Sequence, residues 1–401
     1  MSTPPPQRIR TRVAVIGAGP AGLSLAHMLA LQGVDAVVLE RSSEEHVRSR
    51  VRAGVLEQST VDVFDQLGVS ADLHREALRH KGFYLRFDRT THHLDFHADT
   101  GRNAFVYGQA RVVGDLIDAL PGRAAPVIFD AEAVAVEGIG TDRPEVHFRT
   151  PHSTGVVEAD FVAGCDGFHG VARATAEPHV RTVQRVYPFA WLGILAHSTP
   201  VTEEGMYSAH PDGLSLHSMR GPQLSRQYLQ VPHDTDLAHW SDERIWKELR
   251  HRSAADDADE LETGEIIERS LTRLRSAVTE PMRVGSLFLL GDAAHILPPT
   301  GAKGLNLAVS DACVLSNALG GYYADRRTDL LDAYSVTALE RIWQTQAFSW
   351  RLTSALHRHD DEFDWPLRRA RLQRWVASET ARRELGEVYL GLPFPTDWRY
   401  R

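Results

Sequence analysis

A strand, a glycine-rich turn, a helix and a second strand follow one another in residues 12–41, RVAVIGAGPAGLSLAHMLALQGVDAVVLER. The first apolar run ends at Ile16, and three glycines, Gly17, Gly19 and Gly22, lead from it into a helical segment. In such units the first glycine allows the tight turn, the second lets a pyrophosphate approach the backbone, and the third lets helix and strand pack closely. The pattern predicts a dinucleotide-binding βαβ unit and leaves open whether the nucleotide is FAD or NAD.

Glu40, the acidic residue at the end of the second strand, also supports a dinucleotide-binding unit. Glu40 lies about twenty residues beyond the turn, where a carboxylate accepts hydrogen bonds from a ribose. Ala21, inside the turn, belongs with the three glycines among the residues expected at the nucleotide.

A second unusual segment, GDAAHILPPTGAKG, follows an apolar strand at residues 291–304. Asp292, at the carboxyl end of that strand, is expected to accept hydrogen bonds from a sugar-like hydroxyl. The paired prolines fix an extended backbone, and the last two glycines leave room for a flat ring against the main chain. A helix beginning near Leu305 would direct free N–H groups at that ring, and Lys303 would help it to stabilise the negative charge of a reduced flavin. The segment therefore predicts a flavin site.

The remaining pattern predicts an α/β protein with two interleaved lobes and a helical C-terminal region. A Rossmann-like FAD-binding lobe is expected in residues 10–80, 106–180 and 276–325. A mainly antiparallel β-sheet lobe for the substrate is expected in residues 81–105 and 181–275, followed by helices in residues 326–394.

Two short segments in residues 81–97 are predicted to form a β-hairpin. KGFYLRF and THHLDFH, at residues 81–87 and 91–97, alternate as the strands of a hairpin do. His93, Asp95 and His97 would then share one strand face, but a hairpin edge explains them without a metal ion, and we expect no metal site.

Composition and charge exclude several classes of protein. The 401 residues include 44 Lys and Arg against 53 Asp and Glu, and the net charge of −9 argues against a nucleic-acid-binding protein. The longest apolar run, residues 186–196, is too short to span a membrane and is expected to be a buried strand. Two isolated cysteines fit a reducing compartment, so we expect a cytoplasmic protein.

Several segments together resemble a known family. They are the GAGPAG turn, CDGFHG at residues 165–170, GDAAHILPPTGAKGLN at 291–306, RVRAGVLEQSTVD at 50–62 and YLGLP at 389–393. The chain resembles the single-component FAD-dependent aromatic hydroxylases over about residues 10–394.

This resemblance implies FAD as cofactor, NADPH and/or NADH as reductant, and a homodimer. It is strongest to members that hydroxylate 4-hydroxybenzoate at the 3-position with O2, through a flavin C4a-hydroperoxide, to give 3,4-dihydroxybenzoate. Two alternatives stay open. One is the same chemistry on another phenolic acid, such as 3- or 2-hydroxybenzoate, and the other is a flavin reductase or redox sensor that hydroxylates nothing.

The expected substrate site has a cationic end and a phenolic end. Ser218 and Arg220 lie two residues apart on one strand and share a face, and Tyr228 on the next strand can turn toward them. A guanidinium with two hydroxyls suits an aromatic carboxylate, and the resemblance assigns the three residues this role.

At the phenolic end the resemblance implies a proton relay from the substrate hydroxyl to solvent. Its members are Tyr207, Tyr389 and His80, and histidine has a pKa suited to proton exchange near neutrality. The backbone carbonyl of Pro299 matches the acceptor beside the substrate hydroxyl.

The resemblance also implies residues around both nucleotides. Besides those already named for FAD, the expected FAD-binding residues are Arg50, Arg52, Gln109, Arg226, Lys303, Leu305 and Asn306. The expected NAD(P)H-binding residues are Arg41, Ser42, His46, Arg50, His169 and Arg275.

Three positions depart from the family pattern. NADPH-specific members carry Gln and Tyr where Ser42 and His46 stand in this sequence, so use of NADH is also expected. Gln227 stands where the family has a Tyr beside Tyr228, and the sequence predicts no consequence of this exchange.

Overall fold

The structure is a computed structural model that describes residues 7–50, 54–120 and 125–401. The βαβ unit at the start of the chain is confirmed: β2 (Val13–Ile16), α1 (Pro20–Leu31) and β3 (Ala36–Leu39) follow one another. Pro20 at the first turn of α1 presets the helical φ angle. Gly33, at φ +70°, reverses the chain after the helix.

A six-stranded sheet in the order β19-β20-β13-β2-β3-β9 forms the centre of the nucleotide lobe. Its strands are parallel, except that β19 pairs with β20 antiparallel. The other strands of this sheet are β9 (Val127–Ile128), β13 (Phe161–Gly164), β19 (Arg283–Val284) and β20 (Leu287–Leu289). Because parallel strands end at the same edge, three distant stretches of chain meet where ligands bind in such sheets.

Two smaller sheets flank the central one. The first has the order β1-β12-β11-β10 and contains β1 (Gln7–Arg10), β10 (Glu132–Glu137), β11 (Glu145–Arg149) and β12 (Thr154–Glu158). The second has the order β4-β8-β5 and contains β4 (Val55–Glu57), β5 (Leu78–His80) and β8 (Ala104–Val106).

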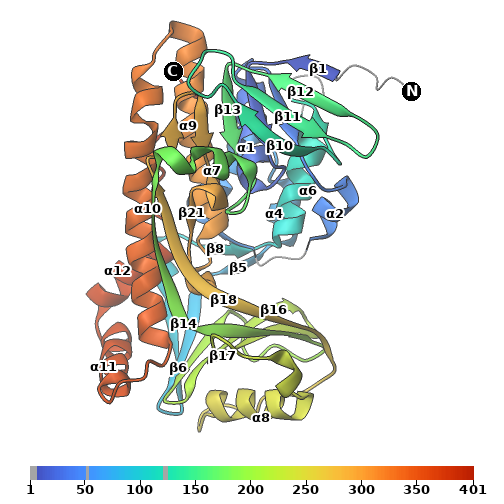
Figure 1. Ribbon diagram of the computed structural model, residues 1–401. Coiled ribbons are helices and arrows are strands. Elements are labelled where there is room, and N and C mark those ends of the chain that lie inside the picture. The colour runs from blue at the N-terminus through green and yellow to red at the C-terminus, as the bar shows by residue number, and fades with distance from the viewer. Residues whose placement is uncertain (1–6, 51–53, 121–124) are drawn as a thin grey trace.

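The substrate lobe is an eight-stranded sheet in the order β21-β18-β14-β17-β16-β15-β6-β7. All its pairs are antiparallel except β15 with β6. The strands are β6 (Gly82–Phe87), β7 (Thr90–Asp95), β14 (Arg181–Ala196), β15 (Met206–His210), β16 (Gly213–Gly221), β17 (Leu224–Pro232), β18 (Ile266–Glu280) and β21 (His295–Ile296). The long strands β14 and β18 run side by side from the nucleotide lobe into the substrate lobe (Figure 1).

Long helices form the C-terminal part of the chain. These are α9 (Gly304–Asp325), α10 (Asp329–Leu356), α11 (Asp364–Ala377) and α12 (Glu379–Tyr389). α10 has 28 residues and passes along both lobes (Figure 1). In the described residues, no helix combines the length and the apolarity that a membrane span requires.

Shorter helices cover the sheets. They are α2 (Glu44–Ser49), α3 (Gln58–Leu67), α4 (Ala71–Glu76), α5 (Phe96–Thr100), α6 (Gln109–Ala119), α7 (Val171–Ala176) and α8 (Asp242–Ser253). Four short 3-10 turns complete the described elements: η1 (Glu177–His179), η2 (Leu237–His239), η3 (Gly291–Ala293) and η4 (Pro299–Gly301).

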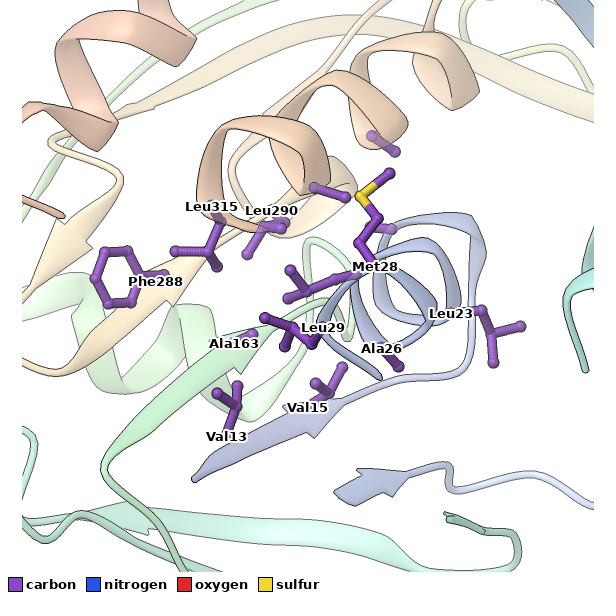
Figure 2. Packing of buried hydrophobic residues seen from close by; sticks show 14 of the residues in the cluster. Val13, Val15, Leu23, Ala26, Met28, Leu29, Ala163, Phe288, Leu290 and Leu315 are labelled. Atoms are coloured by element: carbon purple, nitrogen blue, oxygen red, sulfur yellow. The ribbon is translucent and has the colours of Figure 1, made fainter. Parts of the chain in front are cut away.

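Three buried clusters hold the layers together. The largest lies in the nucleotide lobe, where Val13 and Val15 of β2, Met28 and Leu29 of α1, and Leu315 of α9 meet (Figure 2). Burying each such side chain contributes roughly 1.5–3 kcal/mol. A second cluster lies between the eight-stranded sheet and the C-terminal helices, and a third lies between the sheet and α8. The eight-stranded sheet is therefore covered on both faces.

The predicted fold class is confirmed, and the two lobes are interleaved in sequence. The lobe boundaries stay a prediction. One local prediction was wrong: the second hairpin strand ends at Asp95, whose side chain accepts a hydrogen bond from Ala98 N and caps α5. His97 therefore lies in a helix and does not share a strand face with His93. An N-cap aspartate outweighed the short alternating pattern.

Candidate active site

The turn after β2 contains two glycines that the fold itself requires. Gly17 has φ +104°, and a Cβ there would lie 2.5 Å from the Cys165 carbonyl oxygen. A Cβ on Gly22 would collide with the Gly17 carbonyl oxygen, because α1 packs directly against the turn. By contrast, a Cβ on Gly19 would meet nothing within 4 Å. The second glycine therefore faces open space that a ligand can occupy.

The first turn of α1 and the end of β3 face the same space. Gly19 is the N-cap of α1 and offers no side-chain cap, so the helix N-terminus keeps N–H groups for an anion. Glu40 accepts hydrogen bonds from Ala18 N at 2.8 Å and from Ser42 N at 2.9 Å. These bonds fix the carboxylate beside the turn, and its remaining lone pairs are free to accept from a ribose.

A cleft of about 670 Å³ opens at this edge of the sheet. Of the residues expected to bind FAD, it is lined by Gly17, Gly19, Ala21, Glu40, Arg50, Gln109, Asp292 and Leu305. Of those expected to bind NAD(P)H, it is lined by Arg41, Ser42, Arg50, His169 and Arg275. Most residues that were predicted from scattered motifs are therefore brought to one cavity.

A second group of expected residues lies on one face of the eight-stranded sheet. In the sheet register Tyr207 pairs with Leu216, Leu216 with Tyr228, and Tyr228 with Gly193. Because side chains alternate along a strand, Ser218 shares the face of Leu216. The register of β16 shifts between Met219 and Gly221, and Arg220 is placed on this face by its contacts with Ser218 and Tyr228. Tyr207, Ser218, Arg220 and Tyr228 therefore all lie on the face covered by the C-terminal helices.

Arg220 supplies a positive charge to this face, near Arg226. Its Nη1 donates to the Ser218 hydroxyl and to the Met219 carbonyl oxygen, each at 2.9 Å. Within the described part of the chain, no carboxylate forms an ion pair with it. Burial lowers the pKa of Arg220, and the neighbouring Tyr228 partly opposes this. The arrangement holds a positive charge ready for an anionic ligand.

Aromatic rings surround the other end of the same face. The Tyr207 hydroxyl donates to the Thr300 carbonyl oxygen at 2.6 Å. Phe83 contacts the rings of Tyr207 and Tyr389, with centroids 4.9 Å and 5.1 Å apart. The Pro299 carbonyl accepts from Ala302 N at 3.0 Å, and its second lone pair remains for another donor.

His80, at the end of β5, is buried and 5% exposed. Its Nε2 has no hydrogen-bond partner among the described residues. Burial lowers the pKa of His80, Glu204 raises it and Arg220 lowers it further. A neutral imidazole with a free ring nitrogen fits the expected relay, and the role itself stays a prediction.

Comparison with known proteins identifies the family. A family model described as an FAD binding domain matches residues 10–349. The p-hydroxybenzoate hydroxylase of Acinetobacter baylyi is 42% identical over 392 residues, which are 97% of each chain. The chain belongs to the FAD-dependent aromatic hydroxylases. FAD is accordingly its cofactor, and the open Gly19, the uncapped α1 and the cleft fit a dinucleotide.

More distant relatives share the same fold. The 3-(3-hydroxy-phenyl)propionate/3-hydroxycinnamic acid hydroxylase 2 of Burkholderia vietnamiensis is 26% identical over 327 residues. That alignment covers 78% of this chain and 57% of the relative. The crystal structure of p-nitrophenol 4-monooxygenase PnpA from Pseudomonas putida matches with a TM-score of 0.81, at 20% identity, over 96% of this chain and 99% of that one.

Several residues expected at the nucleotides do not line the cleft of this hydroxylase. These residues are Gly22, His46, Arg226, Lys303 and Asn306. His46 is exposed on α2, and Arg226 donates to Glu268 at 2.9 Å and to Ser270 at 3.1 Å. Arg52 lies outside the described residues. The roles of all five, and of Arg52, stay predictions.

Lys303 belongs to a buried cluster of charges beneath the flavin segment. Its Nζ donates to Glu57 at 2.8 Å and to the Tyr389 carbonyl oxygen at 2.6 Å. The other oxygen of Glu57 accepts from Arg341 at 2.7 Å. Asn306 joins the cluster by accepting from Glu57 N at 2.9 Å. The ammonium therefore points at a carboxylate, and any effect on a flavin acts through this cluster.

Replacing Glu57 by glutamine should lower the free energy of unfolding by about 3 kcal/mol, because two buried cations then lose their shared anion. The side chains of Lys303, Glu57 and Arg341 are 2%, 5% and 5% exposed. Urea unfolding of the FAD-saturated enzyme measures the change. Glu145→Gln, which breaks the exposed pair with Arg8, is the control and should change the free energy of unfolding by less than about 0.5 kcal/mol. Equal effects of the two variants would contradict the prediction.

One acid of the cleft, Asp166, belongs to the segment CDGFHG, and the sequence alone assigned it no role. Asp166 follows β13, lines the cleft and accepts from Ala172 N at 3.0 Å. Burial raises the pKa of Asp166 to about 6, and backbone hydrogen bonds oppose the rise. Its signal was present in the sequence, because Asp166 ends a buried parallel strand as Glu40 does.

Phe168 also lines the cleft and was missed. Its ring lies between two guanidinium groups, 4.0 Å from that of Arg173 and 4.1 Å from that of Arg275. The stacking fixes the position of Arg275 at the mouth of the cleft. No spacing rule in the sequence predicts this contact, because Arg275 comes from β18.

Proposed function

We propose that the enzyme hydroxylates 4-hydroxybenzoate at the 3-position. One molecule each of 4-hydroxybenzoate, O2 and NAD(P)H, with one proton, would give 3,4-dihydroxybenzoate, water and NAD(P)+. The observation that carries the proposal is Arg220, a cation without a carboxylate partner in the described residues, on the same sheet face as Tyr207. The 42% identity to a p-hydroxybenzoate hydroxylase supports the same substrate.

Each end of the substrate has residues suited to it. Arg220 would bind the carboxylate in a bidentate ion pair, with Ser218 and Tyr228 donating further hydrogen bonds. The phenol would lie beside Tyr207 and the Pro299 carbonyl. Loss of the phenol proton makes the ring more electron-rich, so removing that proton activates the ring for attack by an electrophilic oxygen.

The chain's own residues would move that proton. Tyr207 and Tyr389 would pass it toward His80, whose neutral imidazole has a free nitrogen in the described structure. Bound FAD supplies the redox chemistry, taking a hydride from the nicotinamide and activating dioxygen. The buried aromatic side chains Phe83, Tyr207 and Tyr389 would help to exclude water from the reacting ring.

The reductant is a nicotinamide dinucleotide, and we infer that NADH serves as well as NADPH. Arg41, Ser42, His169 and Arg275 line the cleft, which suits a second dinucleotide. His46 lies outside the cleft lining, so it offers little to a 2′-phosphate. Stopped-flow reduction with each coenzyme, with and without 4-hydroxybenzoate, tests both points. Substrate should accelerate reduction by either coenzyme, and reduction by NADPH alone would contradict the inference.

Product analysis tests the proposed reaction. The enzyme is incubated with NAD(P)H, O2 and, separately, 4-, 3- and 2-hydroxybenzoate. We expect 3,4-dihydroxybenzoate from the first acid, in amounts that match the coenzyme consumed. If the enzyme turns over another isomer faster, that isomer and not 4-hydroxybenzoate is the substrate. Coenzyme oxidation that no phenolic acid changes would favour a reductase or redox sensor.

We infer a homodimer that forms through α10. Three large apolar side chains, Val336, Trp343 and Trp350, are 75%, 42% and 47% exposed on this helix. Their spacing of seven residues places them on one face, as in a helix–helix seam. Exposed apolar side chains that form such a contiguous surface are typical of protein–protein interfaces.

Replacing both Trp343 and Trp350 by glutamate should convert the dimer to monomers, because buried charges would replace apolar contacts. Light scattering after gel filtration measures the mass. Phe363→Glu, on an apolar side chain that is 70% exposed and lies outside α10, is the control and should leave the dimer intact. A monomeric wild-type enzyme, or a dimer that survives both glutamates, would contradict the inference.

A further inference from the structure

A series of hydrogen-bonded residues, Trp191, His357, Thr353, Thr300 and Tyr207, joins the two ends of the candidate substrate site along α10. It begins at Trp191, whose indole Nε1 donates to His357 Nε2 at 2.6 Å. His357 Nδ1 lies 2.9 Å from the Thr353 carbonyl oxygen. The Thr353 hydroxyl donates to the Thr300 hydroxyl at 3.0 Å. Thr300 in turn accepts the Tyr207 hydroxyl at its carbonyl oxygen, 2.6 Å away.

The protonation of His357 follows from its two partners. A carbonyl oxygen only accepts, so the ring proton lies on Nδ1, and Nε2 is left to accept from the indole. Burial lowers the pKa of His357 to about 3, so the ring stays neutral at all working pH values. The ring is fully buried and stacks on Phe189, with centroids 4.5 Å apart and planes 8° apart. Both of its nitrogens and one of its faces are therefore held in place.

Trp191 connects this histidine to the carboxylate end of the site. It is two residues from Gly193, the partner of Tyr228, and so lies on the same sheet face as Tyr228. The rings of Trp191 and Tyr228 have centroids 4.8 Å apart. A shift of the indole would therefore move the phenol that stands beside Arg220.

We propose that His357 is a positioning residue for the substrate carboxylate. From the C-cap of α10 it fixes Trp191, which packs against Tyr228, and Thr353 in the last turn of the same helix holds Thr300, whose carbonyl accepts from Tyr207. This inference rests on the proposed function. In this arrangement α10 sets the distance between the carboxylate end and the phenol end of the substrate site. That distance determines the length of the acid that fits. Sub-ångström placement of this kind governs how well a bound ring reacts.

A double-mutant cycle tests the proposal. The FAD-loaded variants are His357→Leu, Trp191→Phe and the pair of both, and the ligands are 4-hydroxybenzoate and its neutral analogue 4-hydroxybenzaldehyde. His357→Leu should raise the Kd of 4-hydroxybenzoate about tenfold, the value of one buried hydrogen bond. The Kd of the aldehyde should change by about twofold or less. In the Trp191→Phe background, which has no indole N–H, His357→Leu should have almost no further effect.

A conservative variant separates positioning from general damage. His357→Gln keeps an acceptor for the indole and should restore the Kd of 4-hydroxybenzoate to within about threefold of wild type. If His357→Leu loses FAD, Trp191→Phe alone must reproduce the selective loss, because it removes the same bond without leaving a buried donor.

The outcomes distinguish the two claims. A wild-type enzyme that does not bind 4-hydroxybenzoate overturns the proposed function. A wild-type enzyme that binds it, together with an unchanged Kd in the His357 variants, equal losses for both ligands, or additive effects in the cycle, overturns the positioning role.

Discussion

Arg220→Ala should weaken the binding of 4-hydroxybenzoate about a thousandfold, equivalent to about 4 kcal/mol, while FAD stays bound. The substrate carboxylate would enter the pocket without its counter-ion and lose a bidentate pair. The fold should not suffer, because within the described residues Arg220 forms no ion pair and burial already disfavours its charge. Titration of the oxidised enzyme, followed by flavin absorbance, measures the Kd.

Two further variants make this test specific. Arg220→Lys keeps the charge but loses the forked geometry, so its Kd should fall between wild type and alanine. Arg250→Ala removes an exposed arginine that pairs with Glu260 on the far side of the lobe, and its Kd should match wild type. An alanine variant at position 220 that binds 4-hydroxybenzoate as wild type does would place the carboxylate elsewhere.

Gly19→Val should abolish FAD binding and leave a folded protein, with affinity reduced at least a thousandfold. The reason is the open space over Gly19, where a side chain meets no protein atom within 4 Å but would occupy the room of the pyrophosphate. Absorbance of the purified protein near the flavin band gives the FAD content, and circular dichroism reports the fold.

Gly22→Ala is the contrasting variant. Its added methyl group would collide with the Gly17 carbonyl oxygen, so the turn and α1 must shift and stability should fall together with FAD content. Comparing the two variants thus distinguishes a contact with the ligand, at Gly19, from a packing contact within the protein, at Gly22. Full FAD content in the Gly19 variant would show that the pyrophosphate does not cross this turn.

The fold was predictable where local patterns agree with the tertiary structure. The glycine turn at residues 17–22 and the strands on either side of its helix carry a pattern that few other folds share. The short strand near Asp95 was predicted less well. There a capping side chain decided the backbone conformation, and a pattern of two-residue period does not register such a cap.

The candidate site was predictable in the residues that are expected to face ligands, and much less in the residues that hold those side chains in place. Ser218, Arg220 and Tyr228 could be predicted because they lie on two adjacent strands and because the family resemblance assigns them to the substrate carboxylate. The partners of Lys303 and Trp191 are Glu57 and His357, which lie 246 and 166 residues away in sequence. The spacing of residues predicts contacts within one or two neighbouring elements only. It does not predict contacts between elements that are distant in sequence and meet by packing.

The strands β14 and β18 and the helix α10 each run through both lobes, although the pairing of β14 with β18 shifts register between Val186 and Ala190. At 1.5 Å per residue, the 28 residues of α10 extend about 42 Å. A hinge between the lobes would have to bend all three elements at once, so large domain closure is disfavoured in this enzyme. Binding of the coenzyme and release of the product are then expected to need no large movement of one lobe against the other.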